Sequence, residues 1–351
     1  MNLCINIFKP KTMTTLRKKN ALVASFTIFT LLFSCTEGRT IDEPGNLVPK
    51  TVDQDSSLPA ISVNGALLHS EAFGPENGTL IIALHGGPGG DYRYLLNCKD
   101  LAAQGYRVVF YDQRGSGLSQ RFSKNSYTSQ GAGATNIMFE ELKSVIAHYK
   151  KTPNQKVVLL GHSWGAMLAS GYAGKYPEAV QGLIVCEPGG LKWDDVEDYV
   201  KESRSFKLWG EILNDATYLD QFISGKEDQH EILDYKMSML SSKNDITGEG
   251  DFDSSAGWRD GAVIMDALFE VGDKYKSDFS AGLQNYNAPV LFFYSERNKA
   301  YPDSWAQKIT SSYKHVESVK VSNVGHDGIV TNKDAWNSQT KPKIINFINS
   351  L

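Results

Sequence analysis

Short apolar runs alternate with longer amphipathic segments over most of this chain. The apolar runs fall at 79–84, 106–112, 156–161, 182–187 and 289–295, and a further run at 316–322 is rich in valine but mixed in polarity. Segments with apolar positions at helical spacing separate or follow them, at 94–105, 137–150, 164–176, 304–313 and 341–349. Strand, helix and strand in these lengths predict βαβ crossovers, and hence an α/β fold whose mostly parallel sheet has helices on both faces.

One stretch, 188–283, interrupts this alternation. It is longer than a single crossover and is rich in helix formers, tryptophan and acidic residues. We expect it to form an inserted helical cap over the carboxyl ends of the strands, where open α/β sheets bind ligands. The cap divides the predicted core into two parts, 61–187 and 284–351.

Residues 1–35 have the pattern of an export signal. Arg17, Lys18 and Lys19 precede an apolar segment, 21–34, which is shorter than a comfortable membrane span of about 20 residues. LLFSC, at 31–35, resembles a bacterial lipobox, in which the cysteine is lipidated and becomes the mature N-terminus. We therefore expect an exported protein anchored to a membrane through Cys35, with a polar tether at 36–60. An ordinary signal peptide that ends in cysteine is the alternative.

Composition narrows the expected partners. The 351 residues are 41% hydrophobic and 22% charged, with a formal net charge of −4. This balance offers no basic surface for nucleic acid and leaves a small molecule as the expected partner. The cysteines beyond the signal region, Cys98 and Cys186, are expected to be buried thiols. No metal-ligand spacing is present, so we expect neither metal nor cofactor, and the oligomeric state stays open.

GHSWG, Gly161 to Gly165, lies between a predicted strand and a predicted helix. This G-x-S-x-G pattern is typical of a nucleophile elbow, whose turn is so sharp that only small residues fit two positions either side of the serine. Ser163 is therefore the candidate nucleophile. The helix that begins at Trp164 would direct its first amides toward the place where an oxyanion develops in acyl transfer.

HGGPGG, at 85–90, follows the buried run 79–84 and contains four glycines and a proline. Such a loop is either an ordinary turn or a place where a ligand approaches the backbone closely. Acyl transfer needs a second oxyanion donor, which this type of sheet supplies from the loop after an earlier strand. We expect the amide of Gly86 or Gly87 to complete the hole with that of Trp164.

A general base is also required, and His326 is the candidate. It is flanked by glycine in VSNVGHDG and follows the last predicted strand. Two other histidines belong to the loops just described, and the remaining four lie on exposed or cap-like stretches.

Four motifs together carry a family resemblance. HGGPGG, YDQRGSGLS at 111–119, GHSWG and VGHDG, in this order and with a cap between the last strands, resemble the proline iminopeptidase group of α/β-hydrolases. The resemblance covers about 63–351 and implies the α/β-hydrolase fold. It also implies that Asp112 and Arg114 are structural and that carboxylates of the cap hold the free amine of a peptide. The acid-rich stretches 193–199 and 265–270 are the candidates for that role.

The triad acid departs from the family pattern. The acid usually follows the strand at 289–295, but Asn298 stands at that place and carries no charge to stabilise an imidazolium. Glu296 and Asp303 are nearby substitutes. Some related hydrolases, certain haloalkane dehalogenases among them, carry the acid after the preceding strand, where this chain has Glu187. By that resemblance we favour Glu187, while a purely structural role for it stays open.

The leading hypothesis is thus a serine hydrolase that releases an N-terminal residue, such as proline, from short peptides. An esterase acting on small esters is the alternative within the same fold. A dehalogenase is disfavoured, because its nucleophile would be a carboxylate where Ser163 stands. A third hypothesis is a tethered binding protein that lost turnover, and Asn298 is the residue in its favour.

Overall fold

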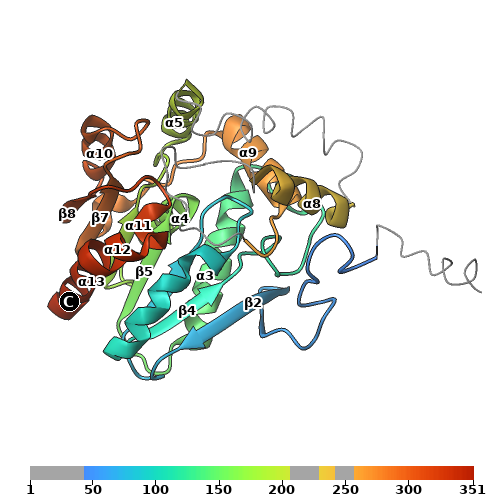
Figure 1. The fold of residues 1–351 in the computed structure, drawn as a ribbon, viewed down its shortest axis with the longest axis horizontal. Helices are drawn as coiled ribbons and strands as arrows, with labels where there is room; N and C mark the ends of the chain where they lie inside the picture. The colour runs from blue at the N-terminus through green and yellow to red at the C-terminus, as the bar shows by residue number, and fades with distance from the viewer. Residues whose placement is uncertain (1–42, 206–228, 242–256) are drawn as a thin grey trace, which may run out of the picture.

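The computed structural model describes residues 43–205, 229–241 and 257–351. Within these residues an eight-stranded sheet has the order β1-β2-β4-β3-β5-β6-β7-β8 (Figure 1). β2 pairs antiparallel with both β1 and β4, and every other pair of neighbouring strands is parallel. The strands are β1 (Ala60–Val63), β2 (Ala66–Phe73), β3 (Leu80–Leu84), β4 (Arg107–Tyr111), β5 (Val157–His162), β6 (Gly182–Cys186), β7 (Val290–Ser295) and β8 (Val316–Val321).

Helices connect the parallel strands or follow the last of them, as the sequence pattern predicts. The main ones are η1 (Tyr92–Gln104), α3 (Ala134–Tyr149), α4 (Trp164–Lys175), α10 (Asp303–Thr310) and α13 (Lys341–Ser350). Shorter ones are α2 (Asn125–Thr128), η2 (Gly131–Gly133), η3 (Leu283–Asn285), α11 (Gly328–Thr331), α12 (Lys333–Ala335) and η4 (Trp336–Thr340). The prediction of a mostly parallel sheet with helices on both faces is therefore confirmed.

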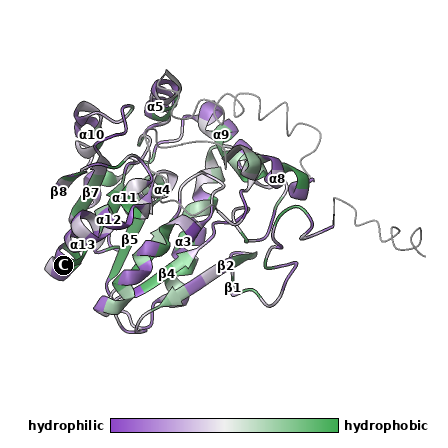
Figure 2. Ribbon diagram, in the orientation of Figure 1, coloured by the Kyte–Doolittle hydropathy of each residue, from purple (hydrophilic) through white to green (hydrophobic). Residues whose placement is uncertain are grey.

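The core consists of two layers, one on each face of the sheet. All of β3 is buried, and its side chains alternate between the layers because successive residues of a strand point to opposite faces. Ile82 packs in the layer with α3 and α4, whereas its neighbours in sequence, Ile81 and Ala83, pack in the layer with η1 and α13. Figure 2 shows the matching pattern, with hydrophobic strands and mixed colours along α3.

The described part of the cap, 188–283, contributes α5 (Trp193–Ser205), α8 (His230–Ser241) and α9 (Ala262–Tyr275). Figure 1 shows these helices at one end of the sheet. Asp91 joins the cap to the core, because its carboxylate accepts the amides of Trp258 and Arg259, the latter at 3.1 Å. Burial, with the charge of Asp112 close by, raises the pKa of Asp91 to about 7. The remaining predicted cap residues, 206–228 and 242–256, lie outside the described residues.

The segment predicted as a polar tether needs a correction. Val48 and Val52 are buried, the Val52 amide donates to the carbonyl of Leu118 at 2.8 Å, and Arg259 donates to the carbonyl of Pro49 at 2.9 Å. The part of the predicted tether at 48–52 therefore packs on the domain through its two valines and its backbone, whereas most other residues of 43–60 are exposed. Cys35 lies outside the described residues, among which no helix is long and apolar enough to cross a membrane.

Candidate active site

Ser163 occupies the turn between β5 and α4 with φ 56° and ψ −121°. Residues other than glycine adopt positive φ only where the surrounding structure enforces it. A Cβ on Gly161 would lie 2.3 Å from the carbonyl oxygen of Gly165, and a Cβ on Gly165 would lie 2.1 Å from that of Leu84. A side chain at either glycine would clash with the backbone of the elbow. The turn can therefore form only with glycine at both positions, which explains the spacing of the motif.

His326 and Glu187 form a buried pair beside this elbow. His326 Nδ1 lies 2.6 Å from Glu187 Oε2, and the two side chains are 2% and 0% exposed. His326 follows β8 and Glu187 follows β6, so two parallel strands place the pair at the carboxyl edge of the sheet. The distance places the Glu187 carboxylate where it can accept the Nδ1 proton of the imidazole.

Both oxygens of the Glu187 carboxylate have two hydrogen-bond partners. Besides His326, its Oε1 accepts the amide and the hydroxyl of Ser295, each at 2.5 Å, and its Oε2 accepts the Asn298 side-chain amide at 3.0 Å. Burial raises the pKa of this carboxyl, but the hydrogen bond and charge of His326 and the Ser295 bonds together outweigh it, so the pKa lies below its ordinary value. Glu187 is therefore held as a carboxylate.

The other two candidate acids lie away from His326. Asp303 is exposed and pairs with Lys320 at 2.7 Å, and Glu296 is exposed and accepts the amide of Asn323 at 2.8 Å. Of the three carboxylates considered from sequence, Glu187 is the one that the structure brings to the histidine. Sequence reasoning missed the Ser295 contact and the donor role of Asn298, because these partners lie 108 and 111 positions from Glu187 with no local signal.

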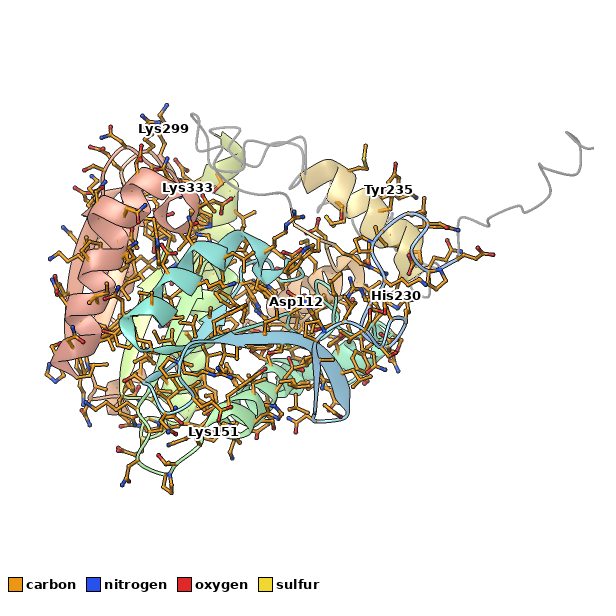
Figure 3. All side chains as sticks on the ribbon, turned by 60° about the horizontal axis from the view of Figure 1, so that its bottom comes forward. Asp112, Lys151, His230, Tyr235, Lys299 and Lys333 are labelled. Atoms are coloured by element: carbon orange, nitrogen blue, oxygen red, sulfur yellow. The ribbon has the colours of Figure 1, made fainter. Side chains whose placement is uncertain are left out.

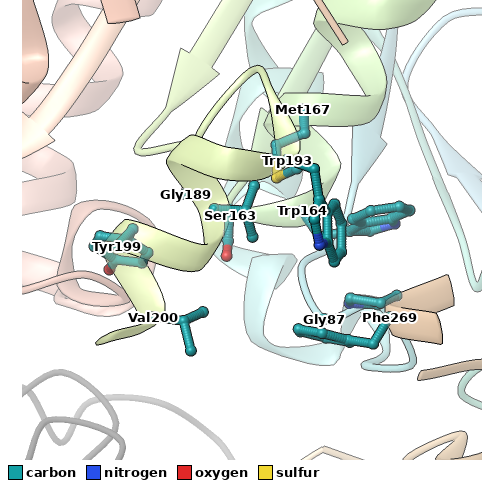
Figure 4. Close-up of a pocket in the computed structure, with 11 residues that line it drawn as sticks. Gly87, Ser163, Trp164, Met167, Gly189, Trp193, Tyr199, Val200 and Phe269 are labelled. Carbon is teal, nitrogen blue, oxygen red and sulfur yellow. The ribbon is translucent and has the colours of Figure 1, made fainter. Parts of the chain in front are cut away.

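A small pocket of about 60 Å³ lies directly at Ser163 (Figure 4). Ser163 and Gly87 line it from the core, and α5 and α9 cover it with Trp193 and Phe269. The remaining lining residues are mostly apolar: Pro88, Trp164, Met167, Gly189, Val196, Tyr199 and Val200. The pocket thus fits a small apolar group held next to the serine oxygen.

The two candidate oxyanion donors in the HGGPGG loop differ in their partners. The Gly86 amide donates to the Tyr94 hydroxyl at 2.7 Å, whereas Gly87 lines the pocket. Gly87 has φ 133°, and a Cβ there would lie 2.5 Å from the amide nitrogen of Gly89. The geometry therefore favours Gly87 over Gly86 as the partner of the Trp164 amide, which stands at the first position of α4.

Comparison with known proteins agrees with this geometry. The family model described as alpha/beta hydrolase fold matches residues 79–333, which is most of the chain. The chain belongs to the α/β-hydrolase family.

Within the α/β-hydrolase family, proteins similar to this chain include several proline iminopeptidases. A proline iminopeptidase of Saccharolobus solfataricus is 42% identical over 105 residues, which are 30% of this chain and 32% of that protein. One of Pestalotiopsis fici is 26% identical over 289 residues, 78% of this chain and 94% of that protein. A proline iminopeptidase-related protein of Thermus thermophilus shares the fold, with a TM-score of 0.58 and 20% identity over 83% of this chain and 98% of that one. The predicted likeness to the proline iminopeptidase group is confirmed, although the chain spans only about a third of the length of the first of these relatives.

Two polar residues near the α/β-hydrolase site have structural partners. Asp112 accepts the amides of Tyr92 and Leu118 and contacts His69 Nδ1 at 2.8 Å, and Figure 3 shows it inside the molecule. Arg114 donates to the buried Glu141 at 2.8 Å. Both residues therefore hold turns together, in agreement with the structural role that the resemblance implies.

Four acidic residues of the cap helices α5 and α9 pair with two lysines. On α5, Asp194 and Glu197 lie 3.4 and 2.5 Å from Lys276. On α9, Asp266 and Glu270 lie 2.6 and 2.8 Å from Lys124. None of the described residues that line the pocket is a carboxylate. An anchor for a substrate amine is thus not among these described lining residues.

Proposed function

We propose that this protein is a serine hydrolase in which Ser163 is the nucleophile, His326 the general base and Glu187 the acid of a triad. The contact between Glu187 and His326 beside the strained elbow is the observation that carries this proposal. Ser163 Oγ attacks the substrate carbonyl while its proton passes to His326 Nε2. The amides of Trp164 and Gly87 stabilise the oxyanion. His326 then returns the proton to the leaving group, and water hydrolyses the acyl-enzyme.

The substrate that we propose is a short peptide with a small apolar N-terminal residue, such as proline. Two observations support it: the relatives are named proline iminopeptidases, and the pocket at Ser163 is small and apolar. Hydrolysis of a small ester is the second candidate. The pairing of the cap acids with Lys124 and Lys276 favours the ester, because an ester needs no amine anchor.

Three substrates separate these candidates: a prolyl arylamide, the same compound with a blocked amine, and a short acyl ester. An aminopeptidase cleaves the first and not the second, whereas an esterase cleaves the third alone. Ser163→Ala is the control, since any turnover that survives it does not come from this site. Absence of turnover with all three would instead favour the tethered binding protein.

We also propose that the protein is exported and lipid-anchored through Cys35, on the bacterial cell surface or its periplasmic side. The support is the sequence pattern of 1–35 alone. Stable anchoring needs more than one acyl chain, as a bacterial lipoprotein has, because a single chain binds a membrane only marginally.

A further inference from the structure

A row of hydrogen bonds connects the HGGPGG loop with the loop that carries His326. The Gly86 amide donates to the Tyr94 hydroxyl at 2.7 Å, and this hydroxyl lies 2.9 Å from His162 Nδ1. His162 Nε2 lies 3.0 Å from the carbonyl oxygen of His326. The reaction steps proposed above use neither Tyr94 nor His162, so this row needs its own explanation.

The carbonyl oxygen of His326 fixes the direction of the bonds to His162. Because a carbonyl can only accept, the proton of a neutral His162 is on Nε2, which donates to it. Nδ1 is then an acceptor and receives the Tyr94 hydroxyl proton, while the Tyr94 oxygen accepts the Gly86 amide. Burial, together with the neighbouring His326, lowers the pKa of His162 well below its ordinary value. Burial also raises the pKa of the Tyr94 hydroxyl, so both groups keep these roles at neutral pH.

The row spans the three parts of the candidate site. Gly86 precedes the favoured oxyanion donor, His162 precedes the nucleophile, and its ring centroid lies 4.5 Å from that of His326. Tyr94 itself stands on η1, outside all three loops. One hydroxyl on a helix therefore holds an oxyanion loop directly and a base loop through one histidine.

We propose that Tyr94 is a positioning residue that sets the HGGPGG loop and the His326 loop relative to Ser163. This proposal rests on the serine-hydrolase function proposed above. Tyr94 contacts no reacting atom in it, so its loss should misplace the transition-state donors without changing how the apolar pocket holds the substrate.

Steady-state kinetics of Tyr94→Phe give the first test. Removing an oxyanion donor outright costs roughly 10²- to 10³-fold in kcat, so a misplaced donor should cost about 10- to 100-fold, with KM changed less than about threefold. Tyr92→Phe is the matched control on the same helix, because the Tyr92 hydroxyl is buried but bonds to Glu71 at 2.7 Å. The proposal is overturned if both variants lose kcat equally or if Tyr94→Phe changes only KM.

A double-mutant cycle with His162→Asn tests whether the row acts as a unit. Asparagine is too short to reach both Tyr94 and the His326 carbonyl. The double variant should lose about as much kcat as the worse single variant, because either change breaks the same connection. Losses that multiply would show that Tyr94 and His162 act independently, and would contradict the proposal.

A nitrogen-15 NMR measurement gives a readout that does not depend on turnover. The wild-type His162 ring should be the neutral Nε2–H tautomer, assigned by loss of its signals in His162→Asn. The Nδ1–H tautomer would refute the bond directions even in an active enzyme. If His162 has the expected tautomer but the protein cleaves no substrate, the hydrogen-bond directions hold and only the proposed function is rejected.

Discussion

Removing the charge of Glu187 while keeping its shape tests the assignment of the triad acid. In Glu187→Gln the new amide can still accept the Ser295 bonds, but its NH₂ group then faces His326 Nδ1 and the Asn298 amide. His326 Nδ1 must then accept a hydrogen bond from this NH₂ group, so the neutral imidazole carries its proton on Nε2. An Nε2 that is already protonated can no longer take the proton of Ser163.

The expected loss is large. The equivalent change in a well-studied serine protease lowers kcat about 10⁴-fold, or about 5 kcal/mol of transition-state stabilisation at 1.36 kcal/mol per tenfold. We expect roughly 10³- to 10⁴-fold here, with KM little changed, because the carboxylate touches no substrate. The assay is kcat and KM on whichever of the three substrates the wild type cleaves, with thermal unfolding to show that the variant is folded.

Asp303→Asn and Glu296→Gln are the matched controls, since both carboxylates are exposed and away from His326. Each should keep kcat within about twofold of wild type. The reasoning is refuted if Glu187→Gln keeps more than a tenth of the wild-type kcat while one of the control variants falls below a tenth.

Three further predictions concern packing, pH and anchoring. Gly165→Ala should lower the melting temperature sharply because its Cβ meets Leu84, whereas Gly133→Ala, with nothing within 4 Å, should change it little; similar melting temperatures would contradict this. The pKa of Asp91 is raised to about 7. The stability that the protonated Asp91 contributes is therefore fully present at a pH below the ordinary pKa of aspartate, and is lost as the pH rises through about 7. Urea unfolding should therefore show wild type losing stability relative to Asp91→Asn between pH 4 and 8, and parallel curves would reject it. Cys35→Ser should move the protein from the membrane to the soluble fraction, and unchanged fractionation would reject lipid anchoring.

Local pattern was enough to predict the parallel part of the fold. Each strand from β3 to β7 is an almost unbroken apolar run, because helices bury both of its faces. β2, with the sequence ALLHSEAF, mixes polar and apolar residues and pairs antiparallel with β1 near the sheet edge. The pattern of apolar runs therefore did not predict it. The packing of Val48 and Val52 was missed for a related reason, since two valines in a polar segment give no periodicity.

The candidate site was predictable where chemistry and spacing are local, as at Ser163 within its elbow. The partner of His326 was not fixed by sequence, because three carboxylates fitted and only the fold brings Glu187 within 2.6 Å. Tyr94 was not predicted at all. Its hydroxyl acts on Gly86 and His162, and the second of these lies 68 positions away.

Identification of the residue that an active-site-directed fluorophosphonate labels is the most direct test of the proposed hydrolase. The account predicts that mass spectrometry of the labelled protein places the modification on Ser163 and that Ser163→Ala prevents labelling without changing the melting temperature. Labelling at another serine that persists in Ser163→Ala, or no labelling of the folded wild type, would contradict it.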